Sequence, residues 1–439
     1  MKKNYLVTEL RLSDWPVSVQ PFWQKVKAVN DPFIRYKTVL IALVCYIVLT
    51  PRLRVKYYYN YALSMILLNL LCIGPSGKGK SMVRFIVNML VNLLFDMNDK
   101  ERDIENEWKR RNKGKTKKEE EPLVCYRIFQ KFTLPQAVKL EDNIRHRFGD
   151  NLPFFLNADE LGSFIENKKG NSEFASVART AYNMGEIYSR DTLYADGHNA
   201  RVDICWNSIV CGQEFALSKY ITKEGLLLGD ASRQIVIKLG EGIGDEAPRM
   251  LPFTAEQELC VSDTVNRLMS ETFTSDGQLQ PTHEIDMSWI YMDVKGWCDW
   301  QREIIDKSAS HAHDSFYGRA SESAFRLATI VYYLFGEDPK KQKNVRRIYF
   351  FFAKYILDGL MAQWGQAYEA AMPKEAETTT ARPTLYDYTQ KRFTRIQLAE
   401  NIKALGLNSA ARKVIYKWKQ RKWIYEVGDV PDTYEKIYT

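Results

Sequence analysis

Over residues 74–81 the chain reads Gly74-Pro75-Ser76-Gly77-Lys78-Gly79-Lys80-Ser81, a complete G-x-x-x-x-G-K-S phosphate-binding pattern. The apolar run Met65–Ile73 precedes it and predicts a buried strand, and the apolar run Met82–Phe95 follows and predicts a helix. In a strand–loop–helix unit, glycines let backbone N–H groups approach phosphate oxygens. The sequence therefore predicts a site for ATP or GTP. The alternative, a glycine turn without a ligand, does not explain why a strand precedes the loop and a helix follows it.

Two side chains of this loop have specific expected roles. Lys80 is expected to reach the β- and γ-phosphates, and the Ser81 hydroxyl is expected to ligate Mg²⁺. The residues from Gly74 to Gly79 are expected to surround the phosphates with backbone. ATP and Mg²⁺ are thus the expected ligands.

Composition describes an ordinary globular protein, with 439 residues, 45% hydrophobic and 26% charged. Seven cysteines are scattered, mostly inside apolar runs, with no C-x-x-C, which predicts buried free thiols in a reducing cytoplasm and neither disulfides nor a zinc site. The apolar stretch Thr38–Thr50 is shorter than the roughly 20 residues that a membrane span needs. We expect a buried helix there and no membrane partner; a membrane-associated segment is the alternative.

The net charge of +8 is unevenly distributed. Residues 391–425 contain ten Lys and Arg against a single acid, Glu400, so this segment carries +9 and the remainder −1. Residues 99–122 are dense in charges of both signs, which predicts a solvated helix end and a loop. A DNA-contacting loop at 109–118 is the alternative, which the neighbouring acids disfavour.

Pattern changes divide the chain into five expected regions. A helical N-terminal collar over 1–60 precedes an alternating strand and helix pattern over 61–252, which predicts an α/β core with a parallel sheet. Long helical patterns over 253–372 predict a helical lid. Residues 373–390 have linker composition, and 391–439 form a basic module.

Hydrolysis needs a carboxylate for Mg²⁺ and a base for water. Residues 153–160 read P-F-F-L-N-A-D-E, a short apolar run that ends in two acids. At the end of a core strand, Asp159 would hold the metal and Glu160 would polarise the attacking water; a helix N-cap is the local alternative. The apolar run 202–213 ends in Gln213, whose amide could orient that water.

Two arginine patterns follow. Arg233 lies between a Gly-Asp turn and a β-rich run, where it could reach the nucleotide of a neighbouring subunit; a surface arginine at a strand edge is the alternative. Arg319, Glu322 and Arg326 are spaced to share one helix face, which also predicts an internal Arg-Glu-Arg ladder.

Taken in order, these segments resemble the motor domain of minichromosome-maintenance-type AAA+ helicases, a P-loop NTPase fold. They also resemble the helicase-like ATPase domain of primase-helicase proteins from bacterial mobile elements and phages. S-R-Q-I-V at 232–236 resembles the S-R-F-D-L of the helicases, R-A-S-E-S-A-F-R-L-A at 319–328 resembles R-x-L-E-x-x-I-R-L, and Gln213 stands where they usually carry Asn. The resemblance covers about residues 60–340. It implies a hexameric ring with Arg233 as arginine finger and Arg319 as the lid-domain sensor arginine.

The resemblance also implies a DNA-contacting hairpin, for which residues 185–201 are the candidate. Asp196-Gly197 would supply its tight turn. Where those helicases carry a tip lysine, this chain offers His198, with Arg190 and Arg201 further down. These three residues are the candidate DNA contacts in the core.

The basic module reads as helix, turn, helix and strand over Phe393–Glu426. Its second helix, 411–422, carries Arg412, Lys413 and Lys417. The module resembles a winged helix-turn-helix, whose second helix enters the major groove of DNA. The alternative is a protein-interaction module.

These features predict an ATP-driven DNA motor, a replicative helicase or initiator of a mobile element or phage, with a primase or initiator as a possible further partner. Two other functions stay open. One is a non-unwinding AAA+ switch, such as a transposition regulator or helicase loader, which the missing tip lysine favours. The other is a P-loop small-molecule kinase with a DNA-binding regulator.

Overall fold

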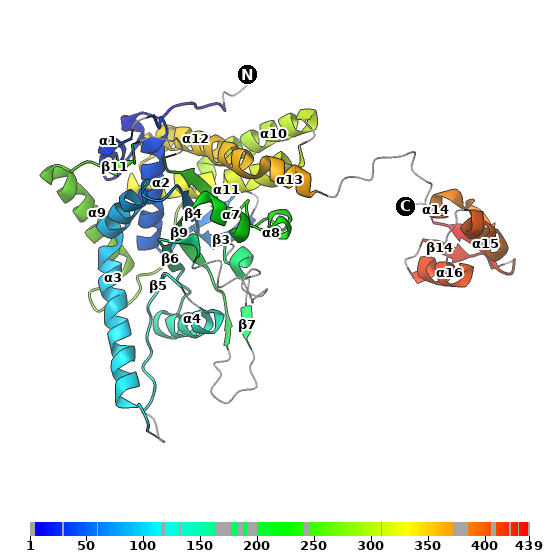
Figure 1. Ribbon diagram of the computed structural model, residues 1–439, viewed down its shortest axis with the longest axis horizontal. Helices are drawn as coiled ribbons and strands as arrows, with labels where there is room; N and C mark the ends of the chain where they lie inside the picture. Colours follow the sequence, from blue (N-terminus) through cyan, green and yellow to red (C-terminus); the bar gives the residue numbers. More distant parts are fainter. Residues whose placement is uncertain are drawn as a thin grey trace. The chain divides into compact units, whose positions relative to one another are not determined.

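The computed structural model describes residues 5–28, 30–58, 60–115, 119–131, 133–162, 177–182, 188–190, 200–240, 246–308, 310–372, 385–404, 410–420, 423–428 and 430–437. The chain divides into two compact units, Met1–Met372 and Pro373–Thr439 (Figure 1). The larger unit combines helices with a parallel sheet, which confirms the predicted α/β class.

A five-stranded sheet lies at the centre of the larger unit, with the spatial order β10-β4-β9-β6-β5. Its strands are β4 (Asn69–Ile73), β5 (Ile128–Phe129), β6 (Phe154–Ala158), β9 (Trp206–Gly212) and β10 (Ile235–Lys238). All four pairings are parallel. Every residue of β4 and β9 is buried, as expected for inner strands covered on both faces.

Two predicted strand runs are wrong in their boundaries. The run 65–73 is divided, because Met65 ends β3 (Asn60–Met65), which pairs with β2 (Leu53–Tyr57) in a separate sheet. The run 202–213 is also divided, since Val202 ends β8 (Ala200–Val202) and β9 starts at Trp206. In both places the apolar run continues across a change of sheet, so hydrophobicity alone gives no boundary.

Helix α2 (Ile34–Leu49) is buried at all but one of its 16 residues, which confirms the predicted buried helix. It packs against strand β9 and helix α3 (Lys80–Arg111). The predicted helix after the phosphate loop is confirmed but runs 16 residues beyond Phe95, because its charged second half remains helical. In the described part of the chain, no helix has the length and apolarity needed to cross a membrane.

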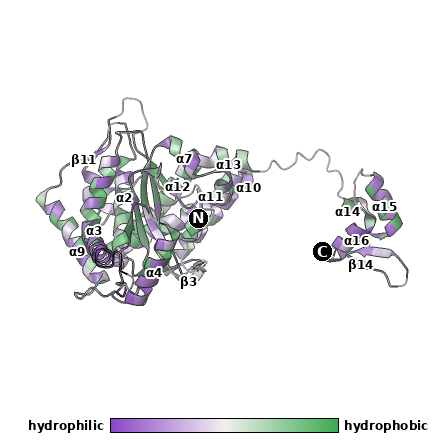
Figure 2. Cartoon of the chain, turned by 60° about the horizontal axis from the view of Figure 1, so that its bottom comes forward, coloured by the Kyte–Doolittle hydropathy of each residue, from purple (hydrophilic) through white to green (hydrophobic). Residues whose placement is uncertain are grey.

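The helices after residue 253 share one hydrophobic core with the sheet and with α2. Figure 2 shows apolar residues gathered around the central strands and polar residues on outer helix faces. These helices are α9 (Ala255–Thr272), α10 (Tyr291–Ser308), α11 (His311–Leu334), α12 (Gln342–Leu360), η4 (Met361–Gly365) and α13 (Gln366–Ala371). The seven cysteines all lie in the described residues as free thiols, six of them buried, as predicted.

Further helices and strands complete the larger unit. The helical ones are η1 (Leu12–Asp14), α1 (Gln20–Gln24), α4 (Leu134–Phe148), α7 (Glu214–Tyr220), α8 (Lys223–Leu227), η2 (Ser288–Ile290) and η3 (Pro339–Lys341). The remaining strands are β1 (Val26–Lys27), β7 (Tyr188–Arg190), β11 (Arg249–Met250) and β12 (His283–Glu284). β1 pairs with β11, β7 with β8, and β12 joins the sheet of β2 and β3.

The smaller unit has its own core, built around Phe393, Leu398, Ile415 and Trp418. Its elements are α14 (Leu385–Tyr388), β13 (Arg392–Thr394), α15 (Arg395–Ala404), α16 (Ala411–Gln420), β14 (Ile424–Glu426) and β15 (Thr433–Lys436). The strands form an antiparallel sheet in the order β13-β15-β14. The predicted two helices and following strands are present, and β13 is an addition; residues 406–409, the predicted turn, lie outside the described residues.

Glu141 on α4 is a fully buried carboxyl group. Burial raises its pKa well above the ordinary value, and nearby Asp203 adds to the rise, whereas Arg127 and Arg145 oppose it. An unfolded glutamate titrates near about pH 4.3. The stability associated with Glu141 is therefore complete below that pH and is lost as pH rises toward the higher folded pKa.

We predict that Glu141→Gln becomes progressively more stable than the wild type between pH 5 and pH 8. The gain grows by up to about 1.4 kcal/mol per pH unit, because the variant has no carboxyl group to ionise. Thermal denaturation followed by circular dichroism across this range measures the difference. The exposed Glu120, changed to Gln, is the matched control. A difference between Glu141→Gln and wild type that does not change with pH would contradict the prediction.

Candidate functional site

The phosphate loop connects β4 to α3 and is shaped by its glycines. Gly77 and Gly79 have φ angles of 76° and 82°, in the left-handed region that favours glycine. A Cβ atom on Gly79 would lie 2.8 Å from Pro248 Cγ, and one on Gly74 would lie 2.5 Å from the Leu239 carbonyl oxygen. The pattern glycines are therefore required by backbone conformation and by the chain that passes beside the loop.

Helix α3 begins at Lys80, directly after the left-handed Gly79. The first N–H groups of a helix have no partner within it and form, with the helix dipole, a favourable environment for anions. No acidic residue lies in the first turn of α3. The loop and the helix N-terminus together can thus bind phosphate groups.

The structure brings Asp159 and Glu160 next to this first turn, directly after β6. Lys80 Nζ lies 3.2 Å from Glu160 Oε1, and Arg84 Nη2 lies 2.5 Å from Asp159 Oδ2. The Glu160 side chain is 67% exposed, and the Asp159 side chain is 43% exposed. Exposed ion pairs of this kind contribute little to stability, so a ligand can replace them at low free-energy cost.

Gln213 lies between the phosphate loop, which follows β4, and the acidic pair Asp159-Glu160, which follows β6. The reason is that β9, which Gln213 follows, lies between β4 and β6 in the sheet. Gln213 follows the last residue of β9 and is the N-cap residue of α7. A cleft of about 440 Å³ lies here, lined by residues 73–75, 213–215 and 238–240. The amide of Gln213 is thereby placed beside the start of the phosphate loop.

Three charged residues at this edge have no motif that identifies them. Arg84 faces Asp159 from one turn beyond Lys80. Lys238 is in register with Ile73 of β4, and its Nζ lies 3.2 Å from Glu214 Oε1. Only the register of β10 on β4 shows that Lys238 lies at this edge. The third charged residue, Glu214, could have been identified from the sequence, because it directly follows Gln213.

The donor set fits a phosphate-bound Mg²⁺. Among the described residues, no group of three or more His, Cys, Asp or Glu side chains could hold a metal. Mg²⁺ in nucleotide sites uses one or two carboxylates and completes its shell with phosphate oxygens and water. The exposed Ser81 and the half-exposed Asp159 carboxylate supply such a partial set.

Arg233 and Arg319 lie together at the opposite edge of the sheet. Arg233 precedes β10, whose first residue pairs with Leu70 of β4, and its Nη1 donates to the Gly229 carbonyl at 2.8 Å. Burial and the neighbouring Arg319 both lower the pKa of Arg233. A strand of five residues such as β4 spans roughly 15 Å. The two arginines are therefore remote from the phosphate loop of their own chain.

The predicted ladder on α11 is confirmed. Glu322 accepts from Arg319 Nη1 at 2.7 Å and from Arg326 Nη2 at 2.6 Å. Arg326 is buried, and its Nη1 donates to the Leu67 carbonyl at 2.7 Å, just before β4. The ring of Tyr182 contacts both guanidinium groups. The ladder thus fixes α11 to the edge of the sheet that lies away from the phosphate loop.

The candidate DNA contacts are distributed over both units. Arg190 pairs with Ala200 in the β7–β8 hairpin, and Arg201 is exposed on β8, but His198 and the predicted turn lie outside the described residues. On α16 the side chains of Arg412, Lys413 and Lys417 are exposed. Tyr416 lies among them and is 63% exposed, so this helix presents basic and aromatic groups on one surface.

The sequence comparisons assign no family to this arrangement. No protein-family model matches the chain, and no curated protein matches its sequence. A functional assignment therefore depends on the site itself, with its phosphate loop, two carboxylates and amide at one edge of a parallel sheet.

Proposed function

We propose that the chain hydrolyses ATP and uses the energy to move on DNA as a ring of identical subunits. The observation that carries the proposal is the meeting of the phosphate loop, Asp159, Glu160 and Gln213 at one sheet edge. Each is a group that nucleotide hydrolysis requires: a phosphate cradle, a metal ligand, a base for water and a polar group to orient it.

The two ion pairs suggest how the residues respond to ATP. Lys80 would exchange Glu160 for the β- and γ-phosphates, leaving that carboxylate available to accept a proton from water. Asp159 would likewise exchange Arg84 for the metal, together with Ser81. Mg²⁺ would supply charge neutralisation at the phosphates. Gln213 would hold the attacking water in line.

The opposite-edge location of Arg233 and Arg319 supports an inter-subunit site. One chain cannot bring these arginines to its own loop, but a head-to-tail neighbour can present them there. Repetition of such a heterologous contact forms a ring when its rotation closes, and we propose a hexamer. Arg233 would then stabilise charge on the transferring phosphate of the adjacent subunit, with Arg319 beside it.

The smaller unit supports DNA as the partner. Its exposed Arg412, Lys413 and Lys417 on α16 can neutralise phosphates, and Tyr416 can stack on a base. Its two helices and antiparallel strands support our interpretation of this unit as a winged helix-turn-helix. Arg190, His198 and Arg201 of the larger unit are proposed as further contacts.

We predict different losses for two loop-site variants. Glu160→Gln should retain ATP binding but lose about 10²–10⁴-fold in turnover, because the base is removed. Lys80→Ala should weaken ATP binding itself. Equilibrium binding of a fluorescent ATP analogue and steady-state hydrolysis separate the two effects. Glu224→Gln, on α8, is an acidic control that should change neither. Unchanged turnover in both loop-site variants would contradict the assignment.

We predict that two inactive variants restore activity when mixed. Lys80→Ala retains its arginines and Arg233→Ala retains its loop, so a mixed ring contains intact sites at about a quarter of its contacts. Hydrolysis per subunit should therefore rise when the two proteins are combined. For the wild type, hydrolysis per subunit should increase with protein concentration, because more of the protein is assembled. No recovery on mixing, with each variant folded, would mean that Arg233 does not act between subunits.

We predict that single-stranded or forked DNA stimulates hydrolysis. Changing Arg412, Lys413 and Lys417 together to Gln should weaken DNA binding and reduce the salt dependence of its affinity, by about 0.7 per lost contact on a log–log scale for single strands. Fluorescence anisotropy across salt concentrations measures this slope. Three exposed lysines outside α16, Lys307, Lys340 and Lys343, changed likewise to Gln, provide the control. Hydrolysis indifferent to DNA would favour the ATP-dependent switch.

A further inference from the structure

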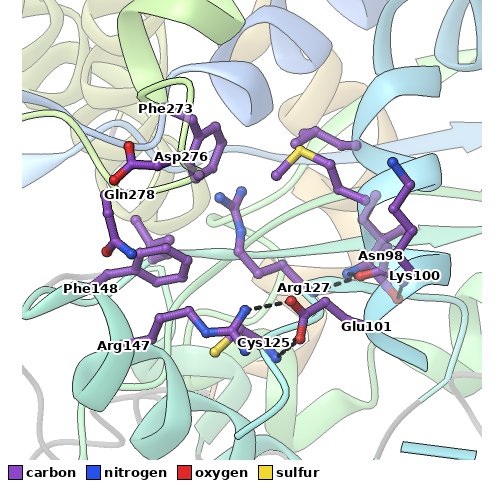
Figure 3. Close-up of a pocket in the computed structure, with 15 residues that line it drawn as sticks. Asn98, Lys100, Glu101, Cys125, Arg127, Arg147, Phe148, Phe273, Asp276 and Gln278 are labelled. Atoms are coloured by element: carbon purple, nitrogen blue, oxygen red, sulfur yellow. Dashed lines mark hydrogen bonds and ion pairs between the residues drawn. The ribbon is translucent and has the colours of Figure 1, made fainter. Parts of the chain in front are cut away.

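A second cavity, of about 440 Å³, lies beside the lower half of α3. It is enclosed by α3, by the segment that leads into β5, by α4 and by the turn after α9, as Figure 3 shows. Its α3 residues, 94–101, occupy the fourth to sixth turns of the helix. At 1.5 Å per residue these turns lie roughly 20–30 Å from Lys80, so this cavity is separate from the phosphate loop.

Arg127 extends into the middle of this cavity (Figure 3). The residue is only 7% exposed, and its Nε and Nη1 atoms are buried without a hydrogen-bond partner in the described part of the chain. Nη2 makes a single long hydrogen bond, 3.4 Å, to the Val48 carbonyl. A buried guanidinium group with unused donors carries a desolvation cost that an anion in the cavity would offset.

The position of Arg127 is fixed by its backbone. Its N–H donates to Asn98 Oδ1 at 2.7 Å, and its carbonyl accepts the Phe155 N–H at 2.8 Å. The first bond attaches Arg127 to α3 and the second attaches it to β6. The side chain is therefore directed into the cavity by the fold, not by an ion pair.

The other charged groups around the cavity leave Arg127 as its central cation. Arg147 pairs with Glu101, whose Oε2 also accepts the Cys125 N–H at 2.8 Å. Asp276 accepts a hydrogen bond from the Thr274 hydroxyl. Lys100 lies exposed at the rim. Burial lowers the pKa of Arg127 to about 10, against the opposing effect of the buried Glu141, so the group remains charged at neutral pH.

One wall of the cavity is aromatic and apolar. The rings of Phe148 and Phe273 lie 6.3 Å apart at 58°, and Leu94, Met97 and Leu152 are further apolar residues that line the cavity. A ligand in contact with this wall needs an apolar or planar body. The volume suits a small organic molecule.

We propose that this cavity binds a small organic anion, a carboxylate or phosphate monoester attached to an aromatic or apolar group. Among the described residues, Arg127 has two donors without a partner, Nε and Nη1, which point in different directions, and either one can donate a charge-assisted hydrogen bond to an oxygen of the anion. Phe148 and Phe273 contact the body of the ligand, and Lys100 attracts it at the rim. This site is independent of the proposed ATP chemistry.

The test compares benzoate and phenyl phosphate with inorganic phosphate and benzyl alcohol, using saturation-transfer NMR titrations of the full chain. At least one of the two aromatic anions should bind at least about tenfold more tightly than either inorganic phosphate or the neutral alcohol. The better of the two aromatic probes identifies the anion, carboxylate or phosphate. Equal binding of the anions and the alcohol, or no binding at millimolar concentration, would overturn the proposal.

Variants locate the binding. Arg127→Met should lower affinity for the better probe at least about tenfold, since charged hydrogen bonds are lost, and should remain folded because a buried charge is replaced by an apolar chain of similar length. The exposed Lys100→Met, which leaves the core intact, should lower it several-fold. Lys80→Ala should leave probe affinity unchanged. Full affinity in both Arg127→Met and Lys100→Met, or lost affinity in Lys80→Ala, would place the probe elsewhere and reject the site.

Discussion

The parallel register of β4 with its two neighbours is the constraint on which the rest of the larger unit depends. From Leu70 to Ile73, β4 is paired residue by residue with both β9 and β10. Because all three strands run in the same direction, the residues that follow them lie at one edge of the sheet, and the residues that precede them lie at the opposite edge. The phosphate loop, Gln213 and Lys238 lie at the first edge, and Arg233 and the ladder on α11 at the second.

Helix α3 connects the sheet edge to a second region of the unit. At its start the phosphate loop fixes it, and further down Asn98, Glu101 and Arg102 bind backbone groups of residues 125–128. Its apolar face packs on the buried α2, which in turn lies on β9. The helix is thus held from its first turn to Arg102. The charged residues Lys80 and Arg84 near its start and the lining of the Arg127 cavity therefore belong to the same helix.

Local sequence was sufficient where one segment determines its own structure. The glycine-rich turn before α3, the buried helix predicted at 38–50 and the helix after the turn were all predictable, because glycine spacing and apolar runs are local signals. Positions that depend on pairing were not. Lys238 reaches the edge with the phosphate loop only through its register with Ile73, and β13 has three residues that pair with distant β15. Arg127 stands in an ordinary apolar run, and only the fold encloses it.

The arginines at the second edge have separate tasks that their spacing does not reveal. Arg326 is buried and bonded to the Leu67 carbonyl, so it serves the fold. The Arg319 side chain is 28% exposed and pairs with Glu322, and the nearby Arg233 adds a second positive charge on this face. Their repulsion is relieved when an anion approaches this face. Within the proposed ring, the phosphates bound by an adjacent subunit are such an anion, so ATP itself would favour the contact that completes its site.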